Sequence, residues 1–174
     1  DDAGIVELGD DHADAMRALT ALVYPGYFRP RTRILGRYYG VLDRGRLAAM
    51  AGERMAVSGC TELSAVCTHP DYLGRGLAHR LVAHVAHAIR QRGLQPYLHV
   101  SNRNARAIKV YETSGFVPRR EVTRFALSHA PPASQALRRE PPQRFCVFFA
   151  GVLDHVRRQL RAGRGLVPVE RLEV

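Results

Sequence analysis

The sequence predicts an α/β domain in which the strands of a mixed sheet alternate with helices. A strand-like run at residues 61–68 is followed by a glycine-containing turn, an amphipathic helix at 77–92, a short strand and a second helix. That order is typical of a sheet with a largely parallel centre. Two earlier strand-like runs, joined by Asp43-Arg44-Gly45, predict an antiparallel hairpin before this centre. The length of 174 residues and the hydrophobic content of 46% are enough for one domain with a sizeable core.

The N-terminal half begins with apolar side chains at helical spacing over residues 10–23, so we expect a helix there, capped by Asp10 or Asp11. Residues 24–30 contain two prolines, one glycine and three aromatic residues, and they predict a loop that serves either recognition or packing. Strands are expected next, at residues 37–42, 46–57 and 61–68.

The C-terminal half begins with apolar residues at every fourth position from Leu77 to Ile89, which predict an amphipathic helix over residues 77–92 that Gly93 ends. A short strand at residues 97–100 comes before a second helix at 104–114, which Asn102 or Asn104 caps and Gly115 ends. One or two further strands are expected over residues 116–127.

The composition changes beyond residue 128. Pro131-Pro132 and Pro141-Pro142 bracket a linker-like stretch, and a short apolar run at residues 145–149 precedes a basic end. We therefore expect a folded domain at 1–128, followed at 129–174 by a Pro-rich linker and a basic C-terminal extension of unknown role. We interpret the apolar run as a final strand, a contact of a homodimer or a collapsed tail.

The net charge of +10 is consistent with a protein that binds nucleic acid or another anion. Because Lys109 is the single lysine among 26 cationic residues, the excess also fits an arginine-rich composition without a polyanion. Residues 1–116 carry a net +4 and residues 117–174 a net +6. The sequence lacks the interleaved aromatic and basic residues of single-strand binders, so nucleic acid ranks last among the partners.

The cysteines indicate a reducing compartment. Cys60, Cys67 and Cys146 are isolated from one another, form no CxxC pair and leave no closed disulfide framework, so we expect a cytoplasmic protein. No run approaches the roughly 20 apolar residues that span a bilayer, and we expect no membrane partner. His84 and His87 share a helix face without a third ligand nearby, so no metal site is expected.

Two stretches carry residues suited to chemistry. Gly74 and Gly76 lie between a strand and the first turn of a strong helix, where backbone amides can hold a diphosphate, although a tight structural turn has the same appearance. The stretch lacks the Gly-Lys-Ser/Thr ending of a P-loop and the GxGxxG of a dinucleotide fold. Asn104 and Tyr111 are seven residues apart, so they share one helix face and can address one ligand. Alternatively, Tyr111 is a packed core tyrosine.

Together these stretches resemble the GNAT superfamily of acetyl-CoA-dependent N-acetyltransferases. The resemblance covers residues 5–128 in element order and is most specific in the loop 69–78 and in Asn104-x-x-Ala107-Ile108-x-x-Tyr111-Glu112-x-x-Gly115-Phe116. It implies a mixed, mostly antiparallel sheet flanked by helices, with a central splayed parallel strand pair. Leu73 stands where the family usually has Gln or Arg, which puts one polar contact in doubt, because the loop binds mainly through backbone amides.

The resemblance also implies site residues for acetyl-CoA. The backbone of Val66, Cys67 and Thr68 pairs with the pantetheine arm, Asn104 touches that arm, and Tyr111 protonates the leaving thiolate. The pyrophosphate is cradled by residues 74–79, which are Gly74, Arg75, Gly76, Leu77, Ala78 and His79. Arg75 and His79 are the candidates for contact with phosphate charge. A gap between the strands ending at Thr68 and Val100, opening onto residues 74–78, is the structural feature that this site requires.

The expected reaction is direct transfer of the acetyl group to a primary amine of a small molecule or peptide, which requires a neutral amine. A free alkyl amine with a pKa of about 10.4 is neutral about once in 2,500 molecules at pH 7, so a base is expected. His99 and Glu62 are the candidates, with Glu53 as a weaker third. Tyr24, Tyr27 and Phe28 are expected to form a lid over the acceptor. The alternatives are a non-catalytic acyl-CoA sensor and, last, a nucleic-acid binder.

Overall fold

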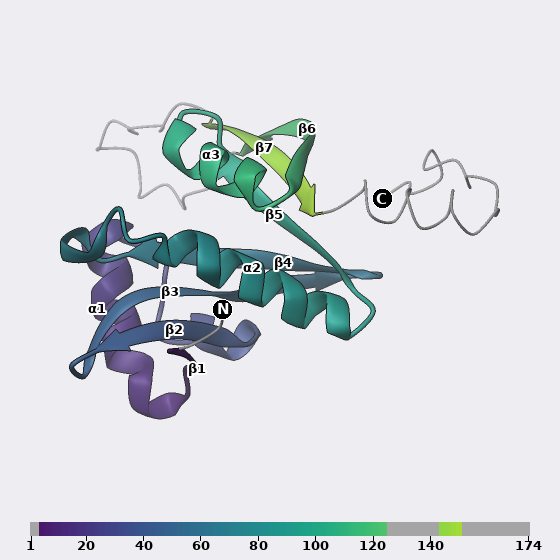
Figure 1. Ribbon diagram of the computed structural model, residues 1–174. Coiled ribbons are helices and arrows are strands. Elements are labelled where there is room, and N and C mark those ends of the chain that lie inside the picture. Colours follow the sequence, from purple (N-terminus) through teal and green to yellow (C-terminus); the bar gives the residue numbers. More distant parts are fainter. Residues whose placement is uncertain (1–3, 125–142, 151–174) are drawn as a thin grey trace, which may run out of the picture.

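One seven-stranded mixed sheet forms the centre of the molecule (Figure 1). The computed structural model describes residues 4–124 and 143–150. The strand order is β1-β2-β3-β4-β5-β7-β6, and every neighbouring pair is antiparallel except the central pair of β4 and β5. The predicted fold class, a mostly antiparallel mixed sheet with helices and a central parallel pair, is confirmed.

The first half of the chain contains the edge strand β1, which we did not predict, and the expected helix and strands: β1 (Ile5–Glu7), α1 (Ala13–Val23), β2 (Tyr38–Asp43), β3 (Arg46–Val57) and β4 (Cys60–Thr68). The expected cap of α1 is wrong. Asp10 and Asp11 lie in a 3-10 turn that precedes the helix, and His12 is the N-cap residue, without a side-chain capping bond. The ring of His12 instead accepts a hydrogen bond of 3.2 Å from the amide of Gly9.

The second half contains α2 (Leu77–Gln91), β5 (Gln95–Ser101), α3 (Ala105–Thr113), β6 (Phe116–Arg124) and β7 (Gln143–Ala150). Asn104, not Asn102, caps α3, because its side chain accepts a hydrogen bond of 3.1 Å from the amide of Ala107. This cap places the Asn104 side chain at the start of the helix that also carries Tyr111.

The last strand, β7, lies beyond the domain boundary that we expected at residue 128. It pairs antiparallel with both β5 and β6, so the interpretation of the apolar run as a final strand is confirmed and that boundary does not mark the end of the sheet. The prolines that suggested the boundary lie between β6 and β7 in the sequence. Residues 129–142 and 151–174 of the expected extension lie outside the described residues.

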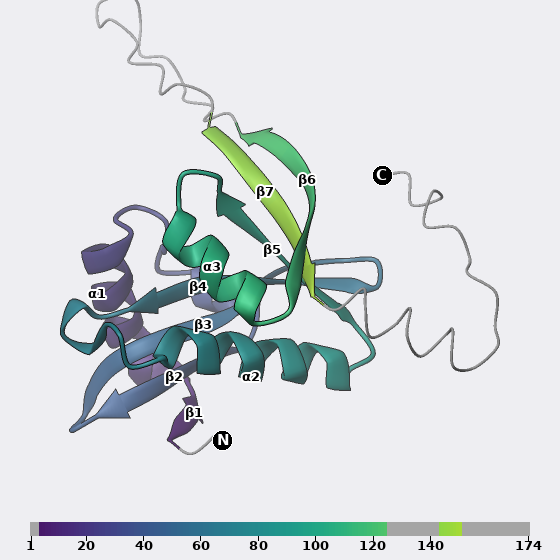
Figure 2. The same ribbon diagram turned by 45° about the horizontal axis from the view of Figure 1, so that its top comes forward.

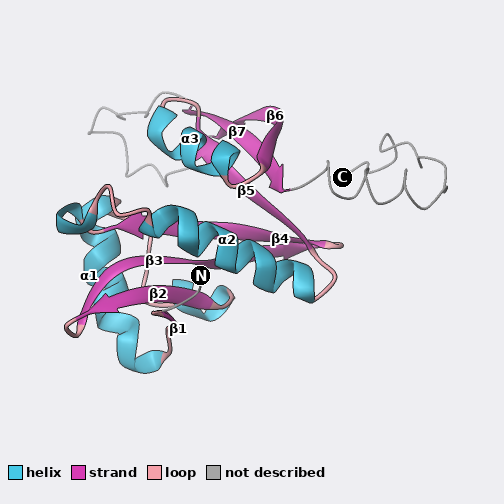
Figure 3. Ribbon diagram, viewed as in Figure 1, coloured by secondary structure: helices cyan, strands magenta, loops and turns pink. Residues whose placement is uncertain are grey.

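Helices cover both faces of the sheet (Figures 2 and 3). α1 packs Met16 and Leu19 onto one face, against a group that contains Tyr38, Met50 and Cys67. On the opposite face lie α2 and α3, whose buried apolar side chains pack on residues of the central strands. Each fully buried apolar side chain of this kind contributes about 1.5–3 kcal/mol. Among the described residues, no helix is long and apolar enough to cross a membrane.

Two β-bulges shape the centre of the sheet. In β3, Arg54 and Met55 together lie opposite Glu62 of β4. In β4, Ala65 and Val66 together lie opposite a single residue of β3, and Ala65 adopts a φ of 52°. Bulges bend the strand that carries them and redirect its side chains. The first therefore determines which β3 side chain meets Glu62, and the second lies where β4 turns away from β5.

Candidate functional site

The parallel pair at the centre of the sheet separates after three rungs. β4 and β5 pair from Cys60 with Gln95 to Glu62 with Tyr97, and the described residues show no rung beyond. β4 continues to pair with β3 on its other side as far as Thr68. Among the residues that the structure describes, the backbone groups of β4 that face β5 beyond Glu62 therefore have no partner strand, and the expected gap between the strands is confirmed.

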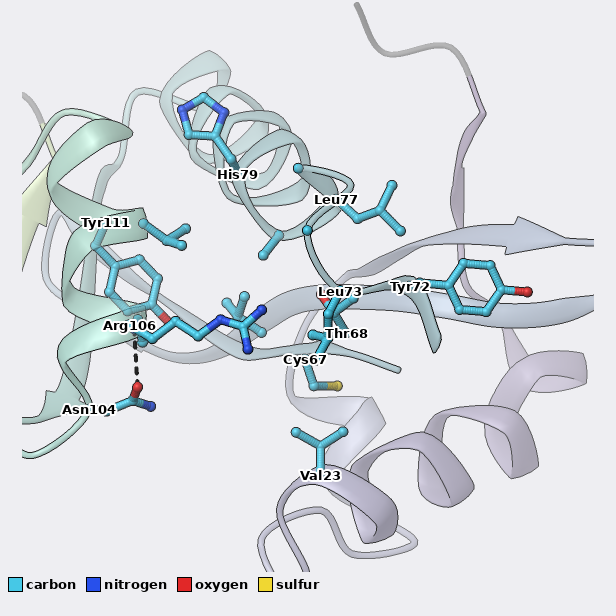
Figure 4. Close-up of a pocket in the computed structure, with 16 residues that line it drawn as sticks. Val23, Cys67, Thr68, Tyr72, Leu73, Leu77, His79, Asn104, Arg106 and Tyr111 are labelled. Carbon is cyan, nitrogen blue, oxygen red and sulfur yellow. Dashed lines mark hydrogen bonds between the residues drawn. The ribbon is translucent and has the colours of Figure 1, made fainter. Parts of the chain in front are cut away.

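A cavity of about 340 Å³ opens in this gap (Figure 4). Its walls come from β4, the loop before α2, the start of α2, α3 and the end of α1. Most of the predicted site residues line it: Val66, Cys67, Thr68, Gly74, Gly76, Leu77, Ala78, His79, Asn104 and Tyr111. Since these residues come from two separate stretches, 66–79 and 104–111, the fold brings together what the sequence suggested separately.

The loop before α2 presents backbone amides to the cavity. Gly74 and Gly76 have φ angles of 79° and 72°, a left-handed conformation that is strained for other residues. α2 has no side-chain cap and no acidic residue in its first turn. The first amides of a helix have no partner within it, and the helix dipole gives this end partial positive charge. The end of the cavity formed by Leu77, Ala78 and His79 is thus suited to an anion such as a diphosphate.

Of the two residues expected to contact phosphate charge, His79 lines the cavity. Arg75 does not line it, because its guanidinium lies 4.7 Å from the centre of the Tyr72 ring. Arg106, in the first turn of α3, lines it instead (Figure 4). The prediction missed Arg106 because it followed only the face shared by Asn104 and Tyr111. The cavity also contains Val23, Tyr72, Leu73, Ala107 and Val110, none of which was among the predicted site residues.

Tyr111 projects from α3 into the cavity (Figure 4). Burial raises its pKa well above the usual range, and the neighbouring Tyr24 and Cys67 raise it further. The phenol therefore keeps its proton at physiological pH. A protonated hydroxyl in the cavity wall can donate a hydrogen bond to a developing negative charge.

Of the three aromatic residues expected to form the acceptor lid, one is hydrogen-bonded to a residue of the cavity wall. The Asn104 side-chain amide donates a hydrogen bond of 2.8 Å to the Tyr24 hydroxyl, which ties the end of α1 to the start of α3. Tyr27 makes an edge contact with Tyr24, at 5.8 Å between ring centres. Phe28 packs against Tyr38 on the α1 face of the sheet. None of the three aromatic residues lines the cavity itself.

Cys67 lies in the cavity wall, and its chemistry limits the possible reactions. Burial raises the pKa of its thiol to about 12. A thiol is nucleophilic as the thiolate, so Cys67 is not poised to form a covalent acyl intermediate.

The two candidate bases, Glu62 and His99, are in contact on the α1 face of the sheet. Oε1 of Glu62 lies 2.9 Å from Nδ1 of His99. Arg54 donates two hydrogen bonds to the same carboxylate, from Nε to Oε2 at 2.9 Å and from the second guanidine nitrogen to Oε1 at 2.7 Å. Burial alone raises the pKa of Glu62, but the hydrogen bonds and charges of His99 and Arg54 outweigh it and bring the pKa below its usual value.

The third candidate base, Glu53, belongs to a different pair. Its carboxylate accepts a hydrogen bond of 2.7 Å from Arg92, the residue that follows α2. This pair lies on the α2 face, away from Glu62. The sequence analysis did not consider Arg54, which meets Glu62 only because of the bulge in β3.

The comparisons with known proteins agree with this geometry. Residues 38–125 match the model of the FR47-like protein family. A GNAT-family protein from Novosphingobium aromaticivorans is 38% identical, with a TM-score of 0.64 over 87% of this chain, and the chain spans 59% of that protein's length. No curated protein sequence matches the chain.

Two more distant structures share the fold. The ribosomal-protein-S18-alanine N-acetyltransferase of Escherichia coli is 18% identical, with a TM-score of 0.67 over 84% of this chain and 91% of its own. An acetyltransferase of Bacillus subtilis in complex with CoA is 15% identical, with a TM-score of 0.68 over 86% and 98%. The family match, which covers half of the chain, and the splayed central strands lead to one conclusion: the chain belongs to the FR47-like family of the GNAT acetyltransferases.

Proposed function

We propose that the protein is an acetyl-CoA-dependent N-acetyltransferase that modifies a primary amine of a small molecule or peptide. The observation that carries the proposal is the gap between β4 and β5, which opens onto the uncapped first turn of α2. Within the sheet, the β4 edge lacks a partner for its backbone groups, and the helix start suits phosphate. The Bacillus subtilis protein of the same fold is seen in complex with CoA, which supports this class of ligand.

The residues of the cavity fit such a substrate. The amides of Leu77, Ala78 and His79 would hold the pyrophosphate, while the free edge of Val66–Thr68 would pair with the pantetheine arm as an added strand does. Arg106 adds a cation at the cavity wall. Asn104 uses its side-chain oxygen to cap α3 and its amide to bind Tyr24, so it would shape the cavity near the arm.

The chemistry would be direct transfer. Acetyl-CoA supplies a thioester, the amine nitrogen forms a bond to its carbonyl carbon, and the bond from that carbon to sulfur breaks. Tyr111 would give its proton to the leaving sulfur, and a base on the acceptor side would take the proton that the amine loses. Cys67 stays a neutral thiol, which favours direct attack over an acyl-enzyme.

The acceptor would approach from the side of the connection between α1 and β2. Tyr24 and Tyr27 are exposed there, with 44% and 51% of their surface accessible, and Tyr24 is bonded to the cavity residue Asn104. Phe28 would anchor this connection to the sheet through Tyr38. The exposed aromatic surfaces provide contact area for an acceptor beside its amine.

The test is a thiol-release assay with acetyl-CoA over polyamines, aminoglycosides, amino acids and peptide N-termini, with mass analysis of the acceptor. The proposal predicts release of CoA together with an acetylated amine for at least one class. Binding of acetyl-CoA in calorimetry without release for any amine would instead indicate an acyl-CoA sensor. Absence of binding would overturn both functions.

A further inference from the structure

The network of Arg54, Glu62 and His99 joins three neighbouring strands, β3, β4 and β5. The Glu62 side chain is 2% exposed, whereas that of His99 is 29% exposed. Arg54 binds both oxygens of the carboxylate, and Nδ1 of His99 lies 2.9 Å from one of them. The carboxylate is thus enclosed by its partners, and the imidazole extends from it toward solvent.

The hydrogen positions in this network follow from the chemistry of the groups. A guanidinium can only donate, so the two bonds from Arg54 require Glu62 to accept through both oxygens. Glu62 is therefore ionised, and Nδ1 of His99 must be the donor in the bond between them. In neutral His99 the hydrogen is then on Nδ1, and Nε2 carries the free lone pair.

The position of His99 in the sheet suits a role in proton transfer. Glu62 and Tyr97 form the last rung of the parallel pair, and His99 is two residues further along β5, where the strands have separated. Alternation along β5 places His99 on the same face as Tyr97, opposite the face of Leu98. Glu62 thus lies at the last rung before the gap and His99 on the strand just beyond it, while neither residue lines the cavity itself.

Other titratable or charged groups face His99 from the neighbouring strands. Tyr97 is 5.7 Å away between ring centres, and Tyr38 of β2 lies near Arg54 and Glu62, where burial raises its pKa to about 12. Arg120 of β6 pairs with Val147 of β7, and Val147 pairs with His99 of β5, so Arg120 lies two strands away from His99. Both tyrosines stay neutral, so Glu62 is the one anion in contact with the imidazole among the described residues.

We propose that Glu62 is a positioning residue and that Nε2 of His99 is the proton acceptor for the amine, an inference that rests on the proposed function. Glu62 holds the imidazole in the tautomer with hydrogen on Nδ1, and Arg54 fixes Glu62. The proton leaves the attacking nitrogen for Nε2 and forms an imidazolium that the Glu62 carboxylate stabilises. The exposed edge of the ring then returns the proton to water.

The β3 bulge makes this arrangement possible. If β3 had no bulge, the pairing that starts at the turn of residues 58–59 would place Met55 opposite Glu62. The Arg54 side chain would then lie on the opposite face of the sheet from Glu62. With the bulge, Arg54 and Met55 share that position. The carboxylate therefore gains its guanidinium partner from a local irregularity that positions a side chain beside the site.

The first test is the dependence of kcat on pH for wild type, His99→Ala, Glu62→Gln and Glu62→Asp. We expect His99→Ala to lose about 10²-fold or more in kcat. Glu62→Gln should lower kcat and change its pH profile, because the imidazole loses the carboxylate that fixes its tautomer. Glu62→Asp keeps the charge and should restore part of the rate. Unchanged profiles in the Glu62 variants would overturn the positioning role.

A matched control separates positioning from stability. Glu53→Gln removes a carboxylate that is similarly buried and is bound to Arg92 at the same 2.7 Å, but on the opposite face. We expect it to lower stability without changing the pH profile or the KM for acetyl-CoA. A profile shift in Glu53→Gln equal to that in Glu62→Gln would show a general structural effect and overturn the proposal.

The second test needs no activity. Nitrogen-15 NMR of the imidazoles, with His99→Gln used to assign the signal, reports which nitrogen carries the hydrogen. Wild type should show hydrogen on Nδ1 of neutral His99, and Glu62→Gln should lose that preference. Hydrogen on Nε2 in wild type would overturn the proposal even if the enzyme is active. Failure of acetyl transfer with the expected tautomer present would overturn the proposed function and, with it, the role of Nε2 as proton acceptor, but not the positioning of His99 by Glu62.

Discussion

The cavity between β4 and α2 and the network of Arg54, Glu62 and His99 are built from different parts of the chain. The cavity uses backbone amides and small residues that lie close together in the sequence, within a loop and the first turn of a helix. The network uses side chains from three strands, and Glu62 and His99 are 37 positions apart in the sequence. One region is suited to hold a substrate and the other to move a proton.

Because one region is made of backbone groups and the other of side chains, the two should tolerate different substitutions. A site made of backbone groups depends on the conformation of the main chain. Leu73 can therefore stand in the place of a polar residue there without removing a backbone amide. A site made of side chains depends on each functional group. Variants of the cavity should therefore change binding, and variants at the reacting groups should change the rate.

The largest expected effect is that of Tyr111→Phe, which removes only the hydroxyl. If Tyr111 protonates the leaving sulfur, kcat should fall by about 10²–10⁴-fold, while the Kd for acetyl-CoA changes little. Steady-state kinetics and calorimetry check this. Tyr39→Phe is the control, since Tyr39 is also buried but does not line the cavity. Equal kcat in Tyr111→Phe and wild type would remove the acid role.

Next in size is Gly76→Ala, with Gly93→Ala as its control at the other end of α2. The two glycines have φ angles of 72° and 75°, and an added Cβ would meet nothing within 4 Å at either position. Both variants should lose about 1–2 kcal/mol of stability through left-handed strain.

Gly76→Ala alone should also weaken the binding of acetyl-CoA, by about tenfold if one hydrogen bond from a backbone amide to a phosphate is lost. Thermal unfolding measures the loss of stability caused by the strain, and the KM for acetyl-CoA reports the loss of binding. An equal rise of KM in the two glycine variants would contradict a phosphate site at the start of α2.

A smaller effect is expected where Asn104 joins α1 to α3. Asn104→Ala should cost about 1 kcal/mol, because the α3 amides lose their cap. Tyr24→Phe removes the bond to Asn104 but keeps the cap, so its stability should stay closer to that of wild type. Chemical denaturation compares the two variants. An equal loss in the two variants would mean that the link to α1, and not the cap, stabilises α3.

The smallest expected effect is a pH dependence of stability at Glu62, where burial opposes the gain from His99 and Arg54. Because its folded pKa lies below the ordinary 4.5, ionised Glu62 stabilises the fold above that pH, and this contribution is lost as the pH falls through the folded pKa. The unfolding free energy of wild type minus that of Glu62→Gln should therefore decrease on acidification. An increase would contradict the lowered pKa.

The sequence predicted the region made of local elements better than the region made of long-range contacts. The β2–β3 hairpin, α2, α3 and the glycine loop follow from spacing and turn residues within short windows, and all are present. Glu62 and His99 were identified singly as bases. Their contact, and the role of Arg54, depend on a bulge that shifts the register between distant residues, which no local pattern encodes.

Tertiary contacts also account for the strand beyond the expected boundary and for the position of Arg75. The prolines after residue 128 indicated the end of a domain, but the chain returns to the sheet as β7 between β5 and β6. Arg75 is expected near phosphate from its place in the loop, and in the structure its guanidinium lies over the Tyr72 ring. In both cases a tertiary contact determined the outcome.

The most direct measurement is calorimetric titration of acetyl-CoA into wild type, Gly76→Ala and Glu62→Gln. Wild type and Glu62→Gln should bind with the same Kd, and Gly76→Ala about tenfold more weakly. No binding to wild type, or an equal loss of affinity in both variants, would contradict the division between a backbone site that holds the substrate and side chains that move the proton.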